Sequence, residues 1–178
     1  IQPMGGAELA VQLGADSADH LGRISDAGIA AMAQSDTVGI LLPGTILFLA
    51  KPHYAPARRM IDAGCAVAIA TDFNPGSCYT QSMTLIMTLA CAQMKMRAEE
   101  VITAATINPA FSLQLDGEVG TLHPGKRADL CVLDIPSWRA VGYAFGGNPV
   151  VMTVKNGEPI VANVTEHRPD WGEVGRRR

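Results

Sequence analysis

Residues 5–72 alternate between short segments, two of them almost wholly apolar, and longer segments in which apolar residues recur every three or four positions. Short apolar runs bounded by turn residues predict strands, and the wider spacing predicts amphipathic helices. Strands that are apolar on both faces and alternate with helices are typical of a parallel sheet covered on both sides, so the predicted fold class is α/β. The predicted strands are 17–21, 38–44 and 65–72, and the predicted helices are 5–15, 25–36 and 54–64.

Turn and cap residues mark the ends of these elements. Ser25 or Asp26 stands where a cap is expected for the helix over 25–36. Pro43-Gly44 ends the middle strand, and Gly64 is placed to stop the third helix. The local signals therefore agree with the hydrophobic pattern.

Two further helices are predicted over 79–96 and 97–115. Asn108-Pro109 marks a break or a fresh start in the second, because the residue before a proline avoids helical geometry. One face of the first helix carries an apolar stripe that is more typical of core filling than of a cofactor site. The stripe consists of Met83, Ile86, Met87, Ala90 and Met94.

The pattern changes after residue 116. Alternating apolar and polar residues over 117–136 and 150–161 predict strands of a small β layer, and Asn156-Gly157 is a strong hairpin signal. The expected organisation is a β/α part over 1–116, a small β composite domain over 117–161 and a polar tail over 162–178.

Composition and charge argue against several classes of function. Of the 178 residues, 48% are apolar and 17% are charged, and the net charge of −3 gives no support for a nucleic-acid partner. The longest apolar run is too short to cross a membrane. The sequence has no G-x-S-x-G elbow, P-loop or G-x-G-x-x-G motif. The cysteines form no C-x-x-C pair and are expected to be reduced core residues of a cytoplasmic protein; they are Cys65, Cys78, Cys91 and Cys131.

His20 and Asp72 each stand at the end of a predicted strand. The carboxyl ends of parallel strands meet at one edge, so these side chains and the Pro43-Gly44 turn are expected to lie together. One histidine and one aspartate suit a divalent metal site or a metal-assisted acid/base pair. Two structural interpretations stay open: His20 as a hydrogen-bonded core residue, and Asp72 as the cap of the next helix.

The residues directly after Asp72 also suit a ligand. Asn74 offers an amide donor and acceptor, Gly76 lets the backbone approach closely, and Ser77 offers a hydroxyl before a helix start. Backbone N–H groups at such a start favour a substrate with an acid group. The alternative is an ordinary turn capped by Ser77.

Several segments together resemble one enzyme family. "GTLHPGKRADLCVLD" (120–134) resembles the segment by which metal-dependent amidohydrolases return from their barrel to a small β domain. "SADHL", "LLPG" and "ATDFNPGS" narrow the resemblance to the imidazolonepropionases of histidine degradation, over about residues 4–160. The resemblance implies the C-terminal part of a (β/α)8 barrel of the TIM type plus strands of a small β-sandwich domain.

The resemblance also implies a role for each candidate residue. Asp72 would be a catalytic metal ligand, for one zinc or iron ion, and His20 a catalytic histidine that contacts the substrate and helps to activate the attacking water. Asn74 and Gly76 would hold the glutamate-like product, and Ser77 the imidazolone substrate. The implied reaction is the hydrolytic opening of 4-imidazolone-5-propanoate to N-formimidoyl-L-glutamate.

Part of the family's site is missing from this sequence. The family's H-x-H metal pair, and a later ligand histidine with a nearby glutamate, come before "SADHL", whereas here no histidine precedes His20. Three strands are also too few for a barrel that takes about 250 residues. We therefore expect a C-terminal part that is inactive alone.

The complete enzyme is expected to act on a small molecule and to bind neither nucleic acid nor membrane. A homodimer is a possible oligomeric state of the complete enzyme. Two alternatives remain at this point. One is an amidohydrolase for another cyclic amide or amidine, and the other is a non-catalytic α/β module that keeps the family core.

Overall fold

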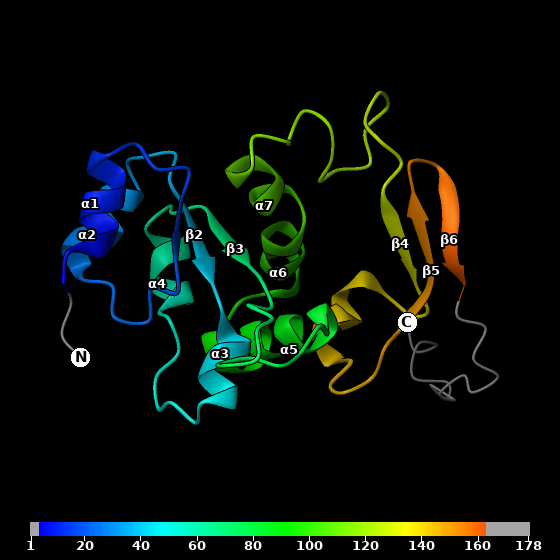
Figure 1. Cartoon of the computed structure of the whole chain (residues 1–178), viewed down its shortest axis with the longest axis horizontal. Helices are drawn as coiled ribbons and strands as arrows, with labels where there is room; N and C mark the ends of the chain where they lie inside the picture. Colours follow the sequence, from blue (N-terminus) through cyan, green and yellow to red (C-terminus); the bar gives the residue numbers. More distant parts are fainter. Residues whose placement is uncertain (1–3, 163–178) are drawn as a thin grey trace, which may run out of the picture.

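Two three-stranded sheets and the helices around them make up the fold (Figure 1). The structure, a computed structural model, describes residues 4–162. The first sheet is parallel, in the order β1–β2–β3, with β1 at Ser17–Asp19, β2 at Val38–Leu41 and β3 at Val67–Ile69. The predicted α/β class is confirmed. Apart from Ala162, the predicted polar tail lies outside the described residues.

Helices connect and cover the parallel strands as predicted. Ser25 is the N-cap of α2, because its side chain accepts a hydrogen bond from the Gly28 N–H at 2.8 Å. Gly64, with φ of 95°, takes the left-handed conformation that ends α4. None of the described helices is long and apolar enough to cross a membrane. The three predicted helices are observed as α1 (Gly6–Gln12), α2 (Asp26–Met32) and α4 (Ala57–Asp62).

One α-helix of the β/α part was not predicted. Residues 43–44 were expected only to end the middle strand, but they begin α3, Pro43–Phe48. Pro43 occupies the first helical position, where its fixed φ suits a helix and its missing N–H costs nothing. The apolar run across 38–50 concealed this change, because a strand and a short buried helix have the same composition there.

The remaining helices pack on the parallel sheet. α5 (Met83–Met94) begins four residues later than predicted, since the loop before it runs to its N-cap Ser82. The break near Asn108 is confirmed: α6 (Ala98–Ala105) ends and α7 (Ile107–Ser112) begins afresh. The Asn108 amide donates to the carbonyl of Val67 at 2.7 Å, which ties α7 to β3.

The core lies between the parallel sheet and these helices. The interpretation of the methionine stripe as core is confirmed, because Ile86, Ala90 and Met94 are buried and Met83 and Met87 pack partly buried against them. Burial of these apolar side chains away from water is the main source of the free energy of folding. Fully buried side chains include Met32, Leu41, Met60 and Val101.

The second sheet is antiparallel, in the order β4–β5–β6. Its strands are β4 (Leu130–Leu133), β5 (Val150–Lys155) and β6 (Glu158–Ala162), and Asn156-Gly157 forms the predicted hairpin turn between the last two. The prediction of a strand over 117–129 is wrong. That segment forms turns, in which the Lys126 ammonium donates to the carbonyls of Asp116 and Val119.

The short helix η1, Trp138–Tyr143, lies between β4 and β5 in the chain and packs on α5 and α6 (Figure 1). A Cβ placed on Gly142 would come within 2.5 Å of the Cys91 sulfur, so only glycine fits this contact. η1 therefore fixes the antiparallel sheet to the helices of the parallel one.

All four cysteines are free thiols. Cys65 and Cys78 are buried and Cys91 is partly buried, as expected for core residues. The prediction that Cys131 is a core residue is wrong: Cys131 is exposed on β4, whose two central residues are both exposed.

A half-buried ion pair joins α4 to α6. The Arg58 guanidinium donates two hydrogen bonds to the Glu100 carboxylate, at 2.8 and 3.0 Å, and the Glu100 side chain is only 11% exposed. Burial alone would raise the pKa of Glu100, but the hydrogen bonds from Arg58 and Arg97 outweigh it and lower the pKa from 4.5 to about 2. The ionised form is therefore favoured by the fold.

We predict that Glu100→Gln lowers the free energy of unfolding by about 1–3 kcal/mol, because it removes the charge that a half-buried Arg58 pairs with. The stabilisation from Glu100 is fully present above pH 4.5 and is lost as the pH falls toward about 2. Urea unfolding of this chain at pH 7 and at pH 3 measures both effects. The matched control is Glu118→Gln, whose pair with Arg127 is exposed on both sides; it should cost less than about 1 kcal/mol. Equal losses in the two variants would contradict the prediction.

Candidate active site

His20 and Asp72 lie at the same edge of the parallel sheet. His20 directly follows β1, and Asp72 comes three residues after the last residue of β3. Because β1, β2 and β3 run parallel, their carboxyl ends point the same way. The first residues of α3 follow the central strand, so they stand between the two.

The backbone at both positions is left-handed. His20 has φ of 67° and Asp72 has φ of 52°, a conformation that costs a non-glycine residue free energy. The His20 N–H still donates to the carbonyl of Ile40 at 2.9 Å, so the turn is anchored on β2. Leu21, Ala50 and other non-glycine residues share this conformation, so His20 and Asp72 are candidates because they follow strands at one edge of the sheet, not because of their backbone.

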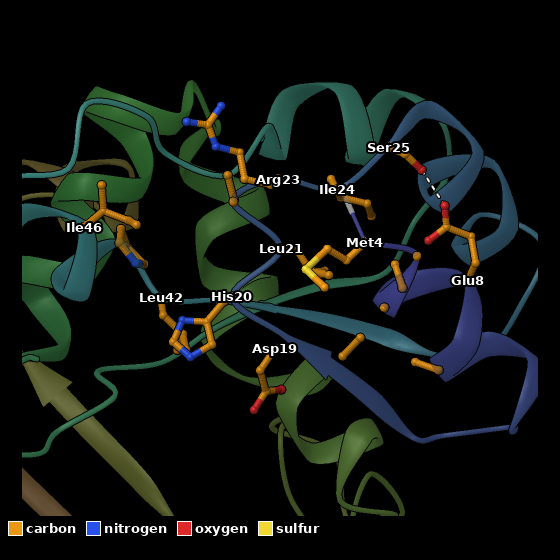
Figure 2. A pocket seen from close by; sticks show the side chains of 18 of the residues that line it. Met4, Glu8, Asp19, His20, Leu21, Arg23, Ile24, Ser25, Leu42 and Ile46 are labelled. Carbon is orange, nitrogen blue, oxygen red and sulfur yellow. Dashed lines mark hydrogen bonds between the residues drawn. The ribbon is translucent and has the colours of Figure 1, made fainter. Parts of the chain in front are cut away.

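The His20 imidazole is exposed and lines a cavity of about 550 Å³ (Figure 2). The interpretation of His20 as a core histidine is therefore wrong. Asp19 and Pro43 also line the cavity, but Asp72 does not. Its walls are largely apolar, with Leu21, Ile24, Leu42, Ile46, Ala55 and Met94 among them.

Asp72 caps no described helix. The next helix, α5, is capped by Ser82, whose side chain accepts from the Leu85 N–H at 3.2 Å. Instead, the Thr45 hydroxyl on α3 donates to Asp72 Oδ2 at 2.6 Å. The other carboxylate oxygen, Oδ1, accepts no hydrogen bond from residues 4–162. The carboxylate is thus held at one oxygen and open at the other.

The side chain of Asn74 organises the loop that follows Asp72. Its Oδ1 accepts from the N–H groups of Gly76 and Ser77, at 2.9 and 2.8 Å. Its Nδ2 donates to the carbonyl of Asp72 at 2.6 Å and to the Ser77 hydroxyl at 2.9 Å. Backbone hydrogen bonds between Asn74 and Cys78 close the loop. Both polar atoms of the Asn74 amide are therefore engaged within the loop.

Two exposed aromatic side chains flank this loop. The rings of Phe73 and Tyr79 are 5.1 Å apart between centroids, a distance at which aromatic rings attract each other. Gly76 is exposed between them in the chain, with the Asn74 Oδ1 as the only neighbour of a would-be Cβ, at 3.4 Å. The loop thus presents accessible backbone beside apolar faces.

A metal ion fits this edge only in part. Asp72 offers one open carboxylate oxygen, the hard or borderline donor that zinc and iron accept. Within the described part of the chain, however, no group of three or more histidine, cysteine or acidic residues could hold an ion. These residues alone therefore do not form a complete metal site.

Comparison with known proteins identifies the family. The model of the amidohydrolase family matches residues 16–160, which include the parallel sheet, every candidate residue and the second sheet as far as the middle of β6. The chain belongs to the amidohydrolase family.

Curated relatives narrow the comparison. The chain is 53% identical to an imidazolonepropionase of Porphyromonas gingivalis over 163 residues, which cover 92% of this chain and 38% of that relative. It is 46% identical to an imidazolonepropionase of Bacillus velezensis over 162 residues, 91% of this chain and 38% of that relative. The chain thus spans well under half the length of the curated relatives it matches.

Solved structures support the fold. An adenosine deaminase from Xanthomonas campestris with bound zinc matches with a TM-score of 0.77 and 22% identity, over 90% of this chain and 44% of that one. An atrazine chlorohydrolase from Arthrobacter aurescens complexed with zinc matches with a TM-score of 0.72 and 19% identity, over 89% of this chain and 42% of that one. At these identities the likeness shows the fold alone.

Sequence reasoning missed Thr45. The signal was a hydroxyl residue directly after Pro43-Gly44, at the carboxyl end of the central strand. It was overlooked because α3 was not predicted, and a threonine in a turn has no reason to face Asp72.

We predict that Asn74→Ala speeds hydrogen exchange at the Gly76 and Ser77 amides by about tenfold or more, because both lose their acceptor. Exchange measured by mass spectrometry on peptides spanning 70–80 tests this. Ser77→Ala, which removes a hydroxyl but keeps the Asn74 Oδ1 acceptor, is the control and should have a smaller effect. If hydrogen exchange at the Gly76 and Ser77 amides is equally fast in Asn74→Ala and Ser77→Ala, the Asn74 side chain does not organise the loop.

Proposed function

We propose that this chain is the C-terminal part of an imidazolonepropionase, a metal-dependent hydrolase of histidine degradation. The substrate is 4-imidazolone-5-propanoate and the product is N-formimidoyl-L-glutamate. The observation that carries the proposal is the identity of about 50% to imidazolonepropionases across 92% of the chain, through the loop that follows Asp72. Because the chain spans 38% of those relatives, the activity belongs to a protein that also supplies the rest.

The fold supports this placement. We assign β1–β3 and their helices, within residues 1–116, to the last strands of a (β/α)8 barrel, and β4–β6, within 117–161, to a small β-sandwich domain. In such a barrel the active site lies at the carboxyl ends of the strands. This is the edge at which His20 and Asp72 lie.

The reaction adds water across a cyclic amide. Water attacks the ring carbonyl carbon, the C–N bond of the ring breaks, and the leaving nitrogen takes up a proton. The carbonyl becomes the second carboxylate of the product. A group must therefore remove a proton from water and deliver one to nitrogen.

Asp72 and His20 take the central roles in this proposal. Asp72 would hold one zinc or iron ion with Oδ1, together with ligands from outside this chain. When bound, the ion supplies Lewis acidity that makes a water molecule easier to deprotonate. The exposed His20 imidazole contacts the substrate and moves the proton, because its two ring nitrogens can accept and donate in turn.

The loop after Asp72 binds the rest of the substrate. The exposed backbone at Gly76 and the amide of Asn74 hold the glutamate-like product, and Ser77 contacts the imidazolone ring. Because the Asn74 amide already serves the loop, its contribution includes the shape that it gives to the Gly76 and Ser77 backbone. The complete enzyme would be cytoplasmic, act on a small molecule alone, and have a homodimer as one arrangement open to it.

The test is a chimera, called here the completed enzyme, in which this chain follows the part of the Porphyromonas gingivalis relative that it does not match. We predict that the completed enzyme opens imidazolone propionate and that Asp72→Asn lowers kcat by about three orders of magnitude, because the amide lacks charge and basicity. Loss of substrate absorbance measures turnover, and circular dichroism checks the fold. Asp134→Asn, the same change at an exposed residue directly after β4, should leave kcat unchanged. Turnover by Asp72→Asn close to that of the unmodified chimera would refute the role of Asp72.

We also predict that this chain alone neither turns over substrate nor retains metal. One carboxylate cannot fix coordination geometry, and a catalytic zinc site usually takes three protein ligands. Elemental analysis after dialysis, followed by assays with added zinc and iron, tests this. Stoichiometric metal together with turnover would show that the described residues hold a complete ligand set.

A further inference from the structure

Thr45 stands where it can control the carboxylate of Asp72. Its side chain is buried, 6% exposed, and its hydroxyl donates to Asp72 Oδ2 at 2.6 Å. Hydroxyl-to-carboxylate bonds of this length are of the strong, charge-assisted kind. Within residues 4–162, Oδ1 accepts no hydrogen bond, so it is the carboxylate oxygen that no described residue engages.

Close packing of α3 brings Thr45 to this place. A Cβ added to Gly44 would lie 2.8 Å from the Cys78 sulfur, 2.8 Å from the Ile86 side chain and 3.6 Å from the carbonyl of Thr71. The first turn of α3 therefore rests directly on the loop that carries Asp72. A side chain at position 44 would force the Cys78 sulfur, the Ile86 side chain or the first turn of α3 to move.

Asp72 is held at two points in consequence. The Asn74 amide donates to its backbone carbonyl at 2.6 Å, and Thr45 donates to its side chain. The first contact stabilises the left-handed backbone, and the second sets the rotation of the carboxylate about its side-chain bonds. A carboxylate held in this way reaches a ligand or a water without losing further rotational freedom.

We propose that Thr45 is a positioning residue, which orients the Asp72 carboxylate so that Oδ1 serves as the metal-binding oxygen. This inference rests on the proposed function, because it takes Asp72 as a metal ligand. Partners that orient a ligand in this way usually contribute 10- to 100-fold to metal affinity. Thr45 itself touches neither ion nor substrate in this proposal.

The experiment compares Thr45→Val with Thr45→Ser in the completed enzyme. Valine keeps the shape of threonine without the donor, and serine keeps the donor. Zinc affinity, measured by competition with a chromophoric chelator, should fall about 10- to 100-fold in Thr45→Val and stay within about threefold in Thr45→Ser. kcat should fall with the affinity in Thr45→Val while KM for imidazolone propionate stays within about twofold, since the substrate contacts are intact.

Other outcomes are decisive as well. If Thr45→Val lowers the melting temperature but leaves zinc affinity unchanged, Thr45 has a structural role only and the inference is overturned. Should Thr45→Val fail to fold, Thr45→Ala takes its place, because it removes the same donor: unchanged zinc affinity in Thr45→Ala would overturn the inference. If zinc affinity responds as expected but no variant opens the ring, the substrate assignment fails while the positioning role stands. A chimera that binds no zinc at all overturns both.

Discussion

Parallel pairing of three short strands is the constraint on which the rest of this structure depends. It directs the chain after β1, β2 and β3 to one edge of the sheet, although the residues concerned are far apart in the sequence. His20, the start of α3 and Asp72 lie along one edge of the sheet for this reason. The apolar core beneath them, with Leu41 and Ile86 fully buried, fixes the sheet and so fixes the edge.

The second sheet depends on a different set of contacts, provided by the segment "GKRADL". Lys126 ties the preceding turns together through the carbonyls of Asp116 and Val119. Asp129 accepts the N–H of Asn156 at 2.8 Å and pairs with Lys155, so it holds the hairpin turn between β5 and β6. The residues most useful for recognising the family thus have structural roles in this molecule.

The order of strands and helices in the β/α part could be predicted from the sequence. Apolar runs indicate the strands, and Ser25 and Gly64 mark helix ends through contacts with residues close to them in the chain. The sequence also indicated His20 and Asp72, since both follow strands. It did not indicate α3, where an apolar run continues from strand into helix without a change in composition. Nor did it show that the Asn74 amide is engaged within its own loop or that Thr45 faces Asp72. The contact between Thr45 and Asp72 depends on how α3 packs against the loop, and the order of apolar and polar residues along the chain does not indicate that packing.

The left-handed backbone at His20 and Asp72 has an evolutionary consequence. Glycine would occupy either position at lower free energy, by about 1 kcal/mol, so selection for stability alone would replace both residues. Other non-glycine residues share this conformation, Leu21 and Ala50 among them, so the left-handed backbone alone does not mark function. At His20 and Asp72, if the proposed function holds, the same cost keeps an imidazole and a carboxylate at the edge of the sheet. Directed evolution for heat resistance, without selection for turnover, would therefore favour glycine at both positions.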